Sequence, residues 1–263
     1  RAALFMIINA EKNGYLKPGY TIIEPTSGNT GISLAAISTS RGYKVIITMP
    51  ENMSKERVNI LKALGAEVFL SPAEDGMDGA IKKAFELKES CKNSVILDQF
   101  SNPYNPLAHS DTTAVEILND MENKVDIFVS GVGTGGTLTG VGVILKSINK
   151  NIEIIAVEPE DSPVLSKGIK GNHKLQGIGA GFIPKTCDVN LIDQIITSST
   201  NGAFLASRTL AKTEGLLAGI SSGAALHAAT TLAKQEKNKN KNIVVILPDS
   251  AEKYLSTELF EDL

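Results

Sequence analysis

The stretch Phe128-Val129-Ser130-Gly131-Val132-Gly133-Thr134-Gly135-Gly136-Thr137 joins an apolar run to a glycine-rich turn. The apolar run from Val125 to Val129 predicts a buried strand, and the pattern from Leu138 to Ile148 predicts a helix. A turn in this position directs backbone amides of the loop and of the helix N-terminus toward one point, where the helix dipole favours negative charge. The sequence therefore predicts a phosphate-binding turn between a strand and a helix.

The identity of the phosphate ligand stays open at this point. Gly131-x-Gly133-x-x-Gly136 fits the dinucleotide fingerprint, and Glu158 ends the next predicted strand at a distance that suits a ribose ligand. These residues allow a nicotinamide dehydrogenase. No Gly-Lys-Ser/Thr closes the turn, which argues against a P-loop. A tight turn without a ligand is the remaining alternative.

The composition favours a globular enzyme over several other classes. The chain has 263 residues, 42% hydrophobic and 21% charged, with a net charge of −3. No basic face stands out, so we expect no nucleic acid partner. No apolar run reaches the length of a membrane span and no signal peptide is recognised, so we expect no membrane association. Two cysteines do not make a disulfide framework, so we expect a reducing, cytoplasmic location. Two distant cysteines and three scattered histidines match no ligand spacing, so we expect no metal site.

Predicted strands and helices alternate along the whole chain. The expected strands are 21–24, 44–49, 67–70, 94–97, 125–129, 152–157, 194–197 and 242–247, the last of a type buried on both faces. The expected helices are 1–12, 30–40, 54–64, 79–90, 105–120, 138–148, 202–214 and 222–235. This alternation predicts an α/β fold with two domains, residues 1–103 and 104–263, each a mostly parallel twisted sheet flanked by helices.

A second glycine-punctuated turn, Glu24–Gly31 (Glu-Pro-Thr-Ser-Gly-Asn-Thr-Gly), also follows a predicted strand and opens a predicted helix. Its amides and hydroxyls suit a carboxylate or another oxyanion, and Asn29 adds a donor and an acceptor. Two anion-binding turns in one chain indicate a phosphorylated cofactor and an acidic substrate. A nicotinamide enzyme does not need this second turn.

Taken together, the motifs resemble the cysteine synthase (O-acetylserine sulfhydrylase) family of fold type II, tryptophan-synthase-β-like pyridoxal phosphate enzymes. The matching stretches run in family order along the chain: Glu24–Gly31, Gln99-Phe100-x-Asn102-Pro103-x-Asn105-Pro106, Gly133–Thr137, Gln176–Pro184, Gly219–Ala224 and Tyr254–Thr257. The resemblance implies a smaller mobile substrate-binding domain in residues 1–103 and a larger cofactor-phosphate domain in residues 104–263.

The resemblance also implies a role for each matching position. The residues implied to bind pyridoxal 5'-phosphate are Gly133, Thr134, Gly135, Gly136 and Thr137 at the phosphate, Asn29 at the phenolic oxygen and Ser221 at the pyridine nitrogen. The residues implied to bind the substrate are Thr26, Ser27, Gly28, Thr30 and Gln99 at the α-carboxylate, with Gly177 in a loop near the entrance. A neutral hydroxyl at the pyridine nitrogen favours β-elimination.

The implied reaction is a ping-pong β-replacement by a transferase. O-acetylserine loses acetate to leave an aminoacrylate, sulfide adds to it, and L-cysteine is released. The family's Schiff-base lysine lies in a Ser-x-Lys-Asp-Arg run, and this chain starts at the Arg of that run. We therefore expect the lysine two positions before Arg1, the N-terminal part of the family fold before Arg1, and no catalytic residue in residues 1–263. The similar run Ser54–Arg57 falls in a family helix without a catalytic role.

Related activities and partners stay open. A cystathionine β-synthase-like or S-sulfocysteine synthase activity would share the pocket and differ in the nucleophile. A non-catalytic scaffold that binds the C-terminal tail of serine acetyltransferase is a further alternative, and the resemblance implies a homodimer. His109–Glu116, Ala251 and Lys253 depart from the usual family motifs and blur the identity of the sulfur donor.

Overall fold

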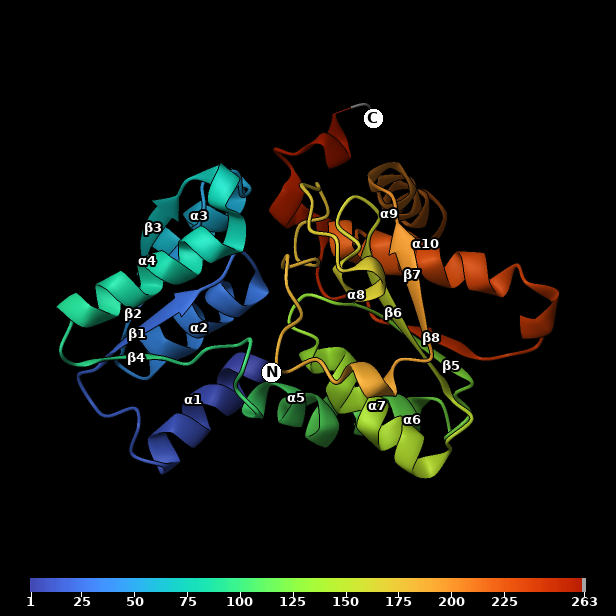
Figure 1. Ribbon diagram of the computed structural model, residues 1–263, viewed down its shortest axis with the longest axis horizontal. Helices are drawn as coiled ribbons and strands as arrows, with labels where there is room; N and C mark the ends of the chain where they lie inside the picture. The colour runs from blue at the N-terminus through green and yellow to red at the C-terminus, as the bar shows by residue number, and fades with distance from the viewer. Residues whose placement is uncertain (262–263) are drawn as a thin grey trace. The chain divides into compact units, whose positions relative to one another are not determined.

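The computed structural model describes residues 1–261 (Figure 1). The chain divides into two compact units, Arg1–Asn105 (unit 1) and the remainder from Pro106 (unit 2). The division follows residue 105 rather than residue 103 because side chains of the connecting stretch bind unit 1. Asn102 Nδ2 donates to the carbonyl of Leu97 at 2.7 Å, and Asn105 Nδ2 donates to the carbonyl of Gln99 at 2.8 Å.

Unit 1 contains a four-stranded parallel sheet in the order β3-β2-β1-β4. Its strands are β1 (Thr21–Pro25), β2 (Lys44–Pro50), β3 (Glu67–Ser71) and β4 (Ser94–Ile96). Its helices are α1 (Ala2–Lys12), α2 (Asn29–Ser40), α3 (Lys55–Ala63) and α4 (Gly76–Ser90).

The central strand β1 is buried along its whole length. Ile22 packs into the cluster formed with α1 and α2, whereas Ile23 packs on the opposite face against Ala84 of α4. Burial on both faces explains why the adjacent residues Ile22 and Ile23 are both apolar rather than alternating with polar ones. The end of β1, where the predicted carboxylate turn begins, is therefore held by packing on both faces of the sheet.

Unit 2 repeats this architecture with a parallel sheet in the order β7-β6-β5-β8. Its strands are β5 (Ile127–Gly131), β6 (Glu153–Pro159), β7 (Gln194–Ser198) and β8 (Ile243–Val245). Its helices are α5 (Tyr104–Ala108, which begins in unit 1), α6 (Ala114–Asp120), α7 (Gly136–Ile148), α8 (Val164–Lys167), α9 (Thr200–Glu214) and α10 (Ile220–Ala233).

Helices cover both faces of the unit 2 sheet (Figure 1). Ile127 and Val129 of β5 pack with residues of α9 and α10, whereas Phe128 packs with residues of α6 and α7. The predicted α/β fold with two parallel sheets is therefore confirmed, and each predicted strand and helix has a counterpart within a few residues.

One detail of the strand prediction is wrong. We expected residues 242–247 to form a strand buried on both faces, but β8 has three residues, Ile243–Val245, all only partly buried. The strand lies at the edge of its sheet, paired with β5 alone. An edge position is set by strand order, which an apolar run does not encode.

The helix predicted for residues 105–120 is continuous but not uniform. A π-helical turn, His109–Thr113, separates α5 from α6. Gly140 of α7 packs here so closely that a Cβ atom on it would lie 2.2 Å from the carbonyl oxygen of Pro106. The wider turn thus coincides with the close approach of a neighbouring helix.

Candidate active site

The predicted carboxylate-binding turn connects β1 to α2 in unit 1. Gly28 is the N-cap of α2 in an extended conformation, and its N–H donates to Thr26 Oγ1 at 3.2 Å. Thr26 is 2% exposed, and a Cβ atom on Gly31 would lie 2.8 Å from its methyl group. The Thr26 hydroxyl therefore shapes the turn, whereas Ser27, Asn29 and Thr30 are only partly buried.

Gln99 lies beside this turn although it is distant in the sequence. Its Nε2 donates to the carbonyl of Pro25 at 3.1 Å, and the residue is 5% exposed. The turn follows β1, and Gln99 follows β4, the strand on the other side of β1 from β2. The strand order changes direction between β1 and β4, and in open α/β sheets ligands bind outside the carboxyl ends of strands at such a point. The structure thus brings the predicted substrate residues of unit 1 together.

Glu24, at the end of β1, is fully buried behind the turn. Its carboxyl oxygens accept the N–H of Gln99 at 2.8 Å and the N–H of Asp98 at 3.0 Å. Burial raises the pKa of Glu24 to about 8, against the opposing effect of the backbone N–H groups of Gln99, Asp98 and Leu97. Glu24 belongs to the family motif Glu24–Gly31, but the sequence analysis predicted no role for it.

Arg57 of α3 is the second buried charged residue at this turn, with 1% exposure. Its guanidinium donates to the carbonyl oxygen of Ser27. The sequence predicted Arg57 only as a residue of the helix 54–64. No pattern in the neighbouring residues indicates that α3 reaches the turn after β1. A buried cation next to the turn favours the binding of an anion there.

The predicted phosphate-binding turn connects β5 to α7 in unit 2. Gly135 is the N-cap of α7 with a left-handed φ of +79°, and the N–H of Gly136 donates to Thr134 Oγ1 at 3.2 Å. The first N–H groups of an α-helix have no partner within the helix, so the 13-residue α7 presents donors and a positive dipole end here.

Close packing allows only glycine at two positions of this turn. A Cβ atom on Gly133 would lie 2.4 Å from the carbonyl oxygen of Gly177, and one on Gly135 would lie 2.4 Å from Cys187 Cβ. The loop containing Gly177 therefore packs directly against the turn, where the N–H of Gly179 donates to the carbonyl of Val132 at 2.9 Å. Burial raises the pKa of the Cys187 thiol to about 11, so Cys187 acts as neutral packing.

Ser221 belongs to the same cluster of residues. It lies in the first turn of α10, is 4% exposed, and its Oγ would be 3.5 Å from a Cβ atom on Gly177. The backbone carbonyl of Ser221 lies 4.0 Å from the position of a Cβ atom on Gly131. The structure thus brings the predicted phosphate turn, Gly177 and Ser221 together within unit 2.

Two groups of the turn, the Thr137 hydroxyl and the Thr134 carbonyl, have supports that the sequence analysis missed. Thr137 Oγ1 lies 3.3 Å from Nε2 of His109, whose Nδ1 lies 3.0 Å from Thr113 Oγ1. Thr186 Oγ1 donates to the carbonyl of Thr134 at 2.6 Å. These contacts join the π-helical turn and the segment before α9 to the phosphate turn, and neither has a signal in local sequence.

The structure removes the acidic ligand that the nicotinamide hypothesis required. Glu158 is 2% exposed, and its carboxylate accepts the N–H of Leu165 at 2.7 Å and the N–H of Ser166 at 3.0 Å. These bonds cap the short helix α8. Because the Glu158 carboxylate accepts these bonds from its own chain, it is not placed to bind a ribose. The dinucleotide fingerprint therefore lacks the acidic residue that it requires.

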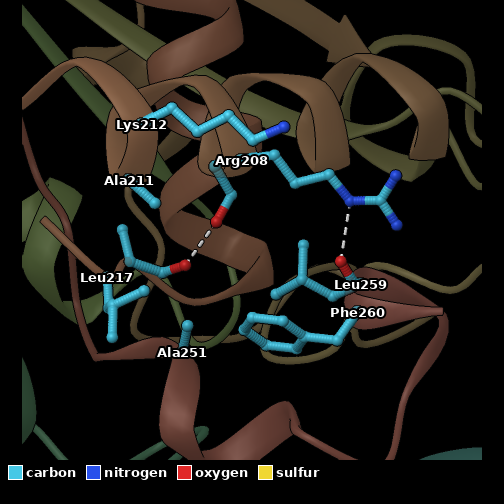
Figure 2. A pocket seen from close by; sticks show the side chains of 9 residues that line it. Arg208, Ala211, Lys212, Leu217, Ala251, Leu259 and Phe260 are labelled. Atoms are coloured by element: carbon cyan, nitrogen blue, oxygen red, sulfur yellow. Dashed lines mark hydrogen bonds between the residues drawn. The ribbon is translucent and has the colours of Figure 1, made fainter. Parts of the chain in front are cut away.

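A cavity of about 160 Å³ lies elsewhere in unit 2, between α9 and the C-terminal segment (Figure 2). Its lining is largely apolar, including Leu217 and Phe260. Arg208 at its edge donates through Nε to the carbonyl of Leu259 at 2.7 Å (Figure 2). None of the predicted site residues lines this cavity.

Within residues 1–261, no group of three or more His, Cys, Asp or Glu side chains is arranged to hold a metal ion. None of the helices in the described range combines the length and the hydropathy that crossing a membrane demands.

Comparison with known proteins agrees with this geometry. Residues 1–249 match the family described as pyridoxal-phosphate dependent enzyme. A cysteine synthase of Staphylococcus aureus is 56% identical over 261 residues, which cover 99% of this chain and 84% of the relative. The solved cysteine synthase of Entamoeba histolytica has a TM-score of 0.93 at 46% identity, covering 98% of this chain and 77% of that one. An O-ureido-L-serine synthase structure has a TM-score of 0.95 at 40% identity, covering 100% and 83%.

The chain is therefore a member of the pyridoxal-phosphate dependent enzymes. Within that class it belongs to the cysteine synthase family.

The turn between β5 and α7 fits the phosphate group of this cofactor. The close contacts at Gly133 and Gly135 leave no room for side chains, so the turn offers backbone N–H groups. Thr134 and Thr137 add hydroxyl groups, and the N-terminus of α7 adds the positive end of a helix dipole. This donor set is the one that a phosphate dianion requires.

Proposed function

We propose that this protein catalyses a β-replacement in which sulfide displaces acetate from O-acetylserine to form L-cysteine by way of an aminoacrylate. The observation that carries the proposal is the pair of strand–turn–helix anion sites, one lined by glycine backbone and the other by hydroxyl and amide side chains. A phosphorylated cofactor and an amino acid substrate together supply one anion for each. Relatives named cysteine synthase support this choice of substrates.

In the proposed enzyme, unit 2 holds the cofactor. The amides and hydroxyls of residues 133–137 bind its phosphate, and the Ser221 hydroxyl binds its pyridine nitrogen. When bound, pyridoxal phosphate supplies a ring that stabilises negative charge at the substrate's α-carbon. Ser221 holds the nitrogen without adding a charge, which moderates electron withdrawal and favours elimination of the β-substituent. Asn29 is assigned to the phenolic oxygen of the ring.

Unit 1 is proposed as the smaller, mobile substrate-binding domain. Ser27, Gly28, Thr30 and Gln99 bind the α-carboxylate, and the Thr26 hydroxyl keeps the turn in shape for it. Fixing the carboxylate orients the α-proton and the β-substituent of the substrate, which accounts for a large share of the rate in reactions of this kind. Gly177, with a φ of +97°, shapes the loop proposed to lie near the substrate's entrance.

The acid–base group of the proposed enzyme is the lysine of the family's Ser-x-Lys-Asp-Arg run. The intact mass of the expressed protein, with and without reduction by borohydride, tests this assignment. A covalent cofactor adduct on one of the lysines within residues 1–263 would contradict it.

Partners and location are proposed from the resemblance. We expect a homodimer, a cytoplasmic location, and binding of the C-terminal tail of serine acetyltransferase. Sedimentation velocity tests the dimer. Isothermal titration with a tail peptide that ends in isoleucine tests the second partner, and an absence of heat with folded protein would contradict it.

Steady-state kinetics test the activity itself. We expect kcat/KM to be highest with sulfide when sulfide, thiosulfate and homocysteine are compared as acceptors at saturating O-acetylserine. A higher value with thiosulfate would instead identify an S-sulfocysteine synthase, and a higher value with homocysteine a cystathionine β-synthase-like enzyme.

A further inference from the structure

The ends of β1 and β4 are joined by a side chain rather than by the sheet. The parallel ladder between these strands pairs Thr21 with Ser94 and ends where Ile23 pairs with Ile96. Beyond this pair, residues 97–99 have no ladder partner in β1. The Glu24 carboxyl accepts the N–H groups of Asp98 and Gln99 at 3.0 and 2.8 Å, although they are 74 and 75 positions away in the sequence.

The backbone that Glu24 holds is not in a relaxed conformation. Asp98 has a φ of +55°, which is uncommon for a residue other than glycine. The Asp98 side chain also accepts the N–H of Phe100 at 3.2 Å, so the turn is fixed from both of its sides. A strained turn of this kind persists only where its surroundings determine it, and such turns concentrate at functional sites.

The same turn determines where Gln99 lies. Its N–H donates to Glu24, its Nε2 donates to the carbonyl of Pro25, and its carbonyl accepts from Asn105 Nδ2 at 2.8 Å. The main-chain N–H bond to Glu24 therefore sets the backbone from which the Gln99 side chain extends toward the β1–α2 turn.

We propose that Glu24 is a positioning residue for the substrate's α-carboxylate: it holds the Asp98–Gln99 turn beside the β1–α2 turn, so that both sides of the carboxylate site have a fixed separation. This inference rests on the proposed function, because it assigns Glu24 to the same carboxylate site. Glu24 acts through Gln99 and does not itself touch the substrate.

The variant Glu24→Gln tests the proposal with little change in shape. It turns one acceptor oxygen into an NH₂ group that faces a backbone N–H, so one of the two bonds is lost. In a ping-pong reaction, kcat/KM for O-acetylserine reports the first half-reaction and kcat/KM for sulfide the second. We expect the first constant to fall by about tenfold or more and the second to change by less than about twofold. Equal losses in both constants would indicate a smaller active fraction, a structural effect only, and would overturn the proposal.

Glu11→Gln is the matched control within unit 1. Glu11 accepts from Arg41 Nε at 2.9 Å and from Tyr43 Oη at 3.0 Å, next to the C-terminal end of α2, and the carboxylate turn is at the other end of that helix. The same chemical change there should leave both kinetic constants as in the wild type. Glu24→Asp, which keeps the acid but shortens it by one methylene, provides a second variant if Glu24→Gln does not fold.

A binding measurement separates this proposal from the proposed function. The amide resonances of Gly28 and Gln99 are followed in cofactor-loaded protein during titration with L-alanine, a carboxylate ligand that cannot react by β-replacement. We expect saturable shifts in the wild type and about tenfold weaker binding in Glu24→Gln. Equal binding by wild type and variant would overturn the role of Glu24 alone. No binding by the wild type would overturn the carboxylate site, and with it both proposals.

Discussion

The two units share one strand order but build their proposed anion sites from different groups. In each sheet the first strand lies between the second and the fourth, and the site turn follows that first strand into a helix. The β5–α7 turn of unit 2 offers glycine backbone packed against neutral groups. The β1–α2 turn of unit 1 offers hydroxyl and amide side chains and is backed by buried Glu24 and Arg57.

This comparison separates where a site lies from what it binds. The position follows from topology, because the point where the strand order reverses leaves strand ends and a helix N-terminus uncovered. The ligand follows from the residues placed there. Glycine allows amides to approach a phosphate that stays bound, whereas side chains supported by buried Glu24 and Arg57 can discriminate among substrates that exchange. The following predictions test this distinction, in order of decreasing expected effect.

The largest difference is expected between equivalent N-cap glycines. Gly135→Ala places a Cβ atom 2.4 Å from Cys187 Cβ at a φ of +79°, so we expect a loss of about 2–4 kcal/mol in stability and about 100-fold or more in cofactor affinity. In Gly28→Ala the new atom meets only Arg57 Nη1, at 4.0 Å. That variant should keep the cofactor affinity of the wild type. Absorbance titration with pyridoxal phosphate measures both, and equal losses would contradict the distinction.

The next prediction concerns the pH dependence of stability, and it involves only unit 1. Because burial raises the pKa of folded Glu24 from 4.5 to about 8, the folded chain keeps a proton that the unfolded chain releases. The stability that Glu24 contributes is therefore complete below pH 4.5 and falls as the pH rises to about 8, by about 1 kcal/mol per pH unit.

Urea unfolding at about pH 5.5 and pH 8.5, followed by tyrosine fluorescence, checks this effect. Four of the five tyrosines lie in unit 1, namely Tyr15, Tyr20, Tyr43 and Tyr104, so the signal reports mainly on that unit. Between these conditions the wild type should lose about 2–3 kcal/mol more than Glu24→Gln. Parallel curves for the two proteins would show that Glu24 does not titrate as its burial demands.

A smaller and reciprocal effect is expected from two threonines. Thr137→Val removes a hydroxyl from the phosphate turn and should weaken cofactor binding by about tenfold with little change in KM for O-acetylserine. Thr30→Val should do the reverse, raising that KM by about tenfold at unchanged cofactor affinity. If either variant changed the cofactor affinity and the KM for O-acetylserine equally, the cofactor and the substrate would not be bound by separate units.

The smallest effect concerns the reactivity of the two cysteine thiols. Burial raises the pKa of the Cys187 thiol to about 11, whereas Cys91 is only partly buried. An aromatic disulfide reagent at pH 7.5 should therefore modify one thiol per folded chain and two in denaturant. Rapid reaction of both thiols in the folded protein would show that the packing behind the phosphate turn is looser than described.

Local patterns predicted the elements and both turns, because apolar runs, glycines and caps act over a few residues. The motifs also singled out Gln99 and Ser221, and the structure brings each to its turn, while their binding roles stay predictions. The supporting contacts were not predictable. Arg57 reaches Ser27 across 30 positions, and Thr186 reaches Thr134 across 52, and such pairs depend on tertiary packing alone. The partial exposure of β8 and the shared strand order of the units depend on topology in the same way.

The π-helical turn at His109–Thr113 determines how the protein responds to the deletion of a residue. Such a turn holds one residue more than an α-helical turn, and it sets the rotation of the side chains of α5 relative to those of α6. Losing a single codon in this stretch would restore a regular helix and swing the preceding side chains by about 100° around the axis. His109 would then point away from Thr137, so this segment tolerates substitution far better than deletion.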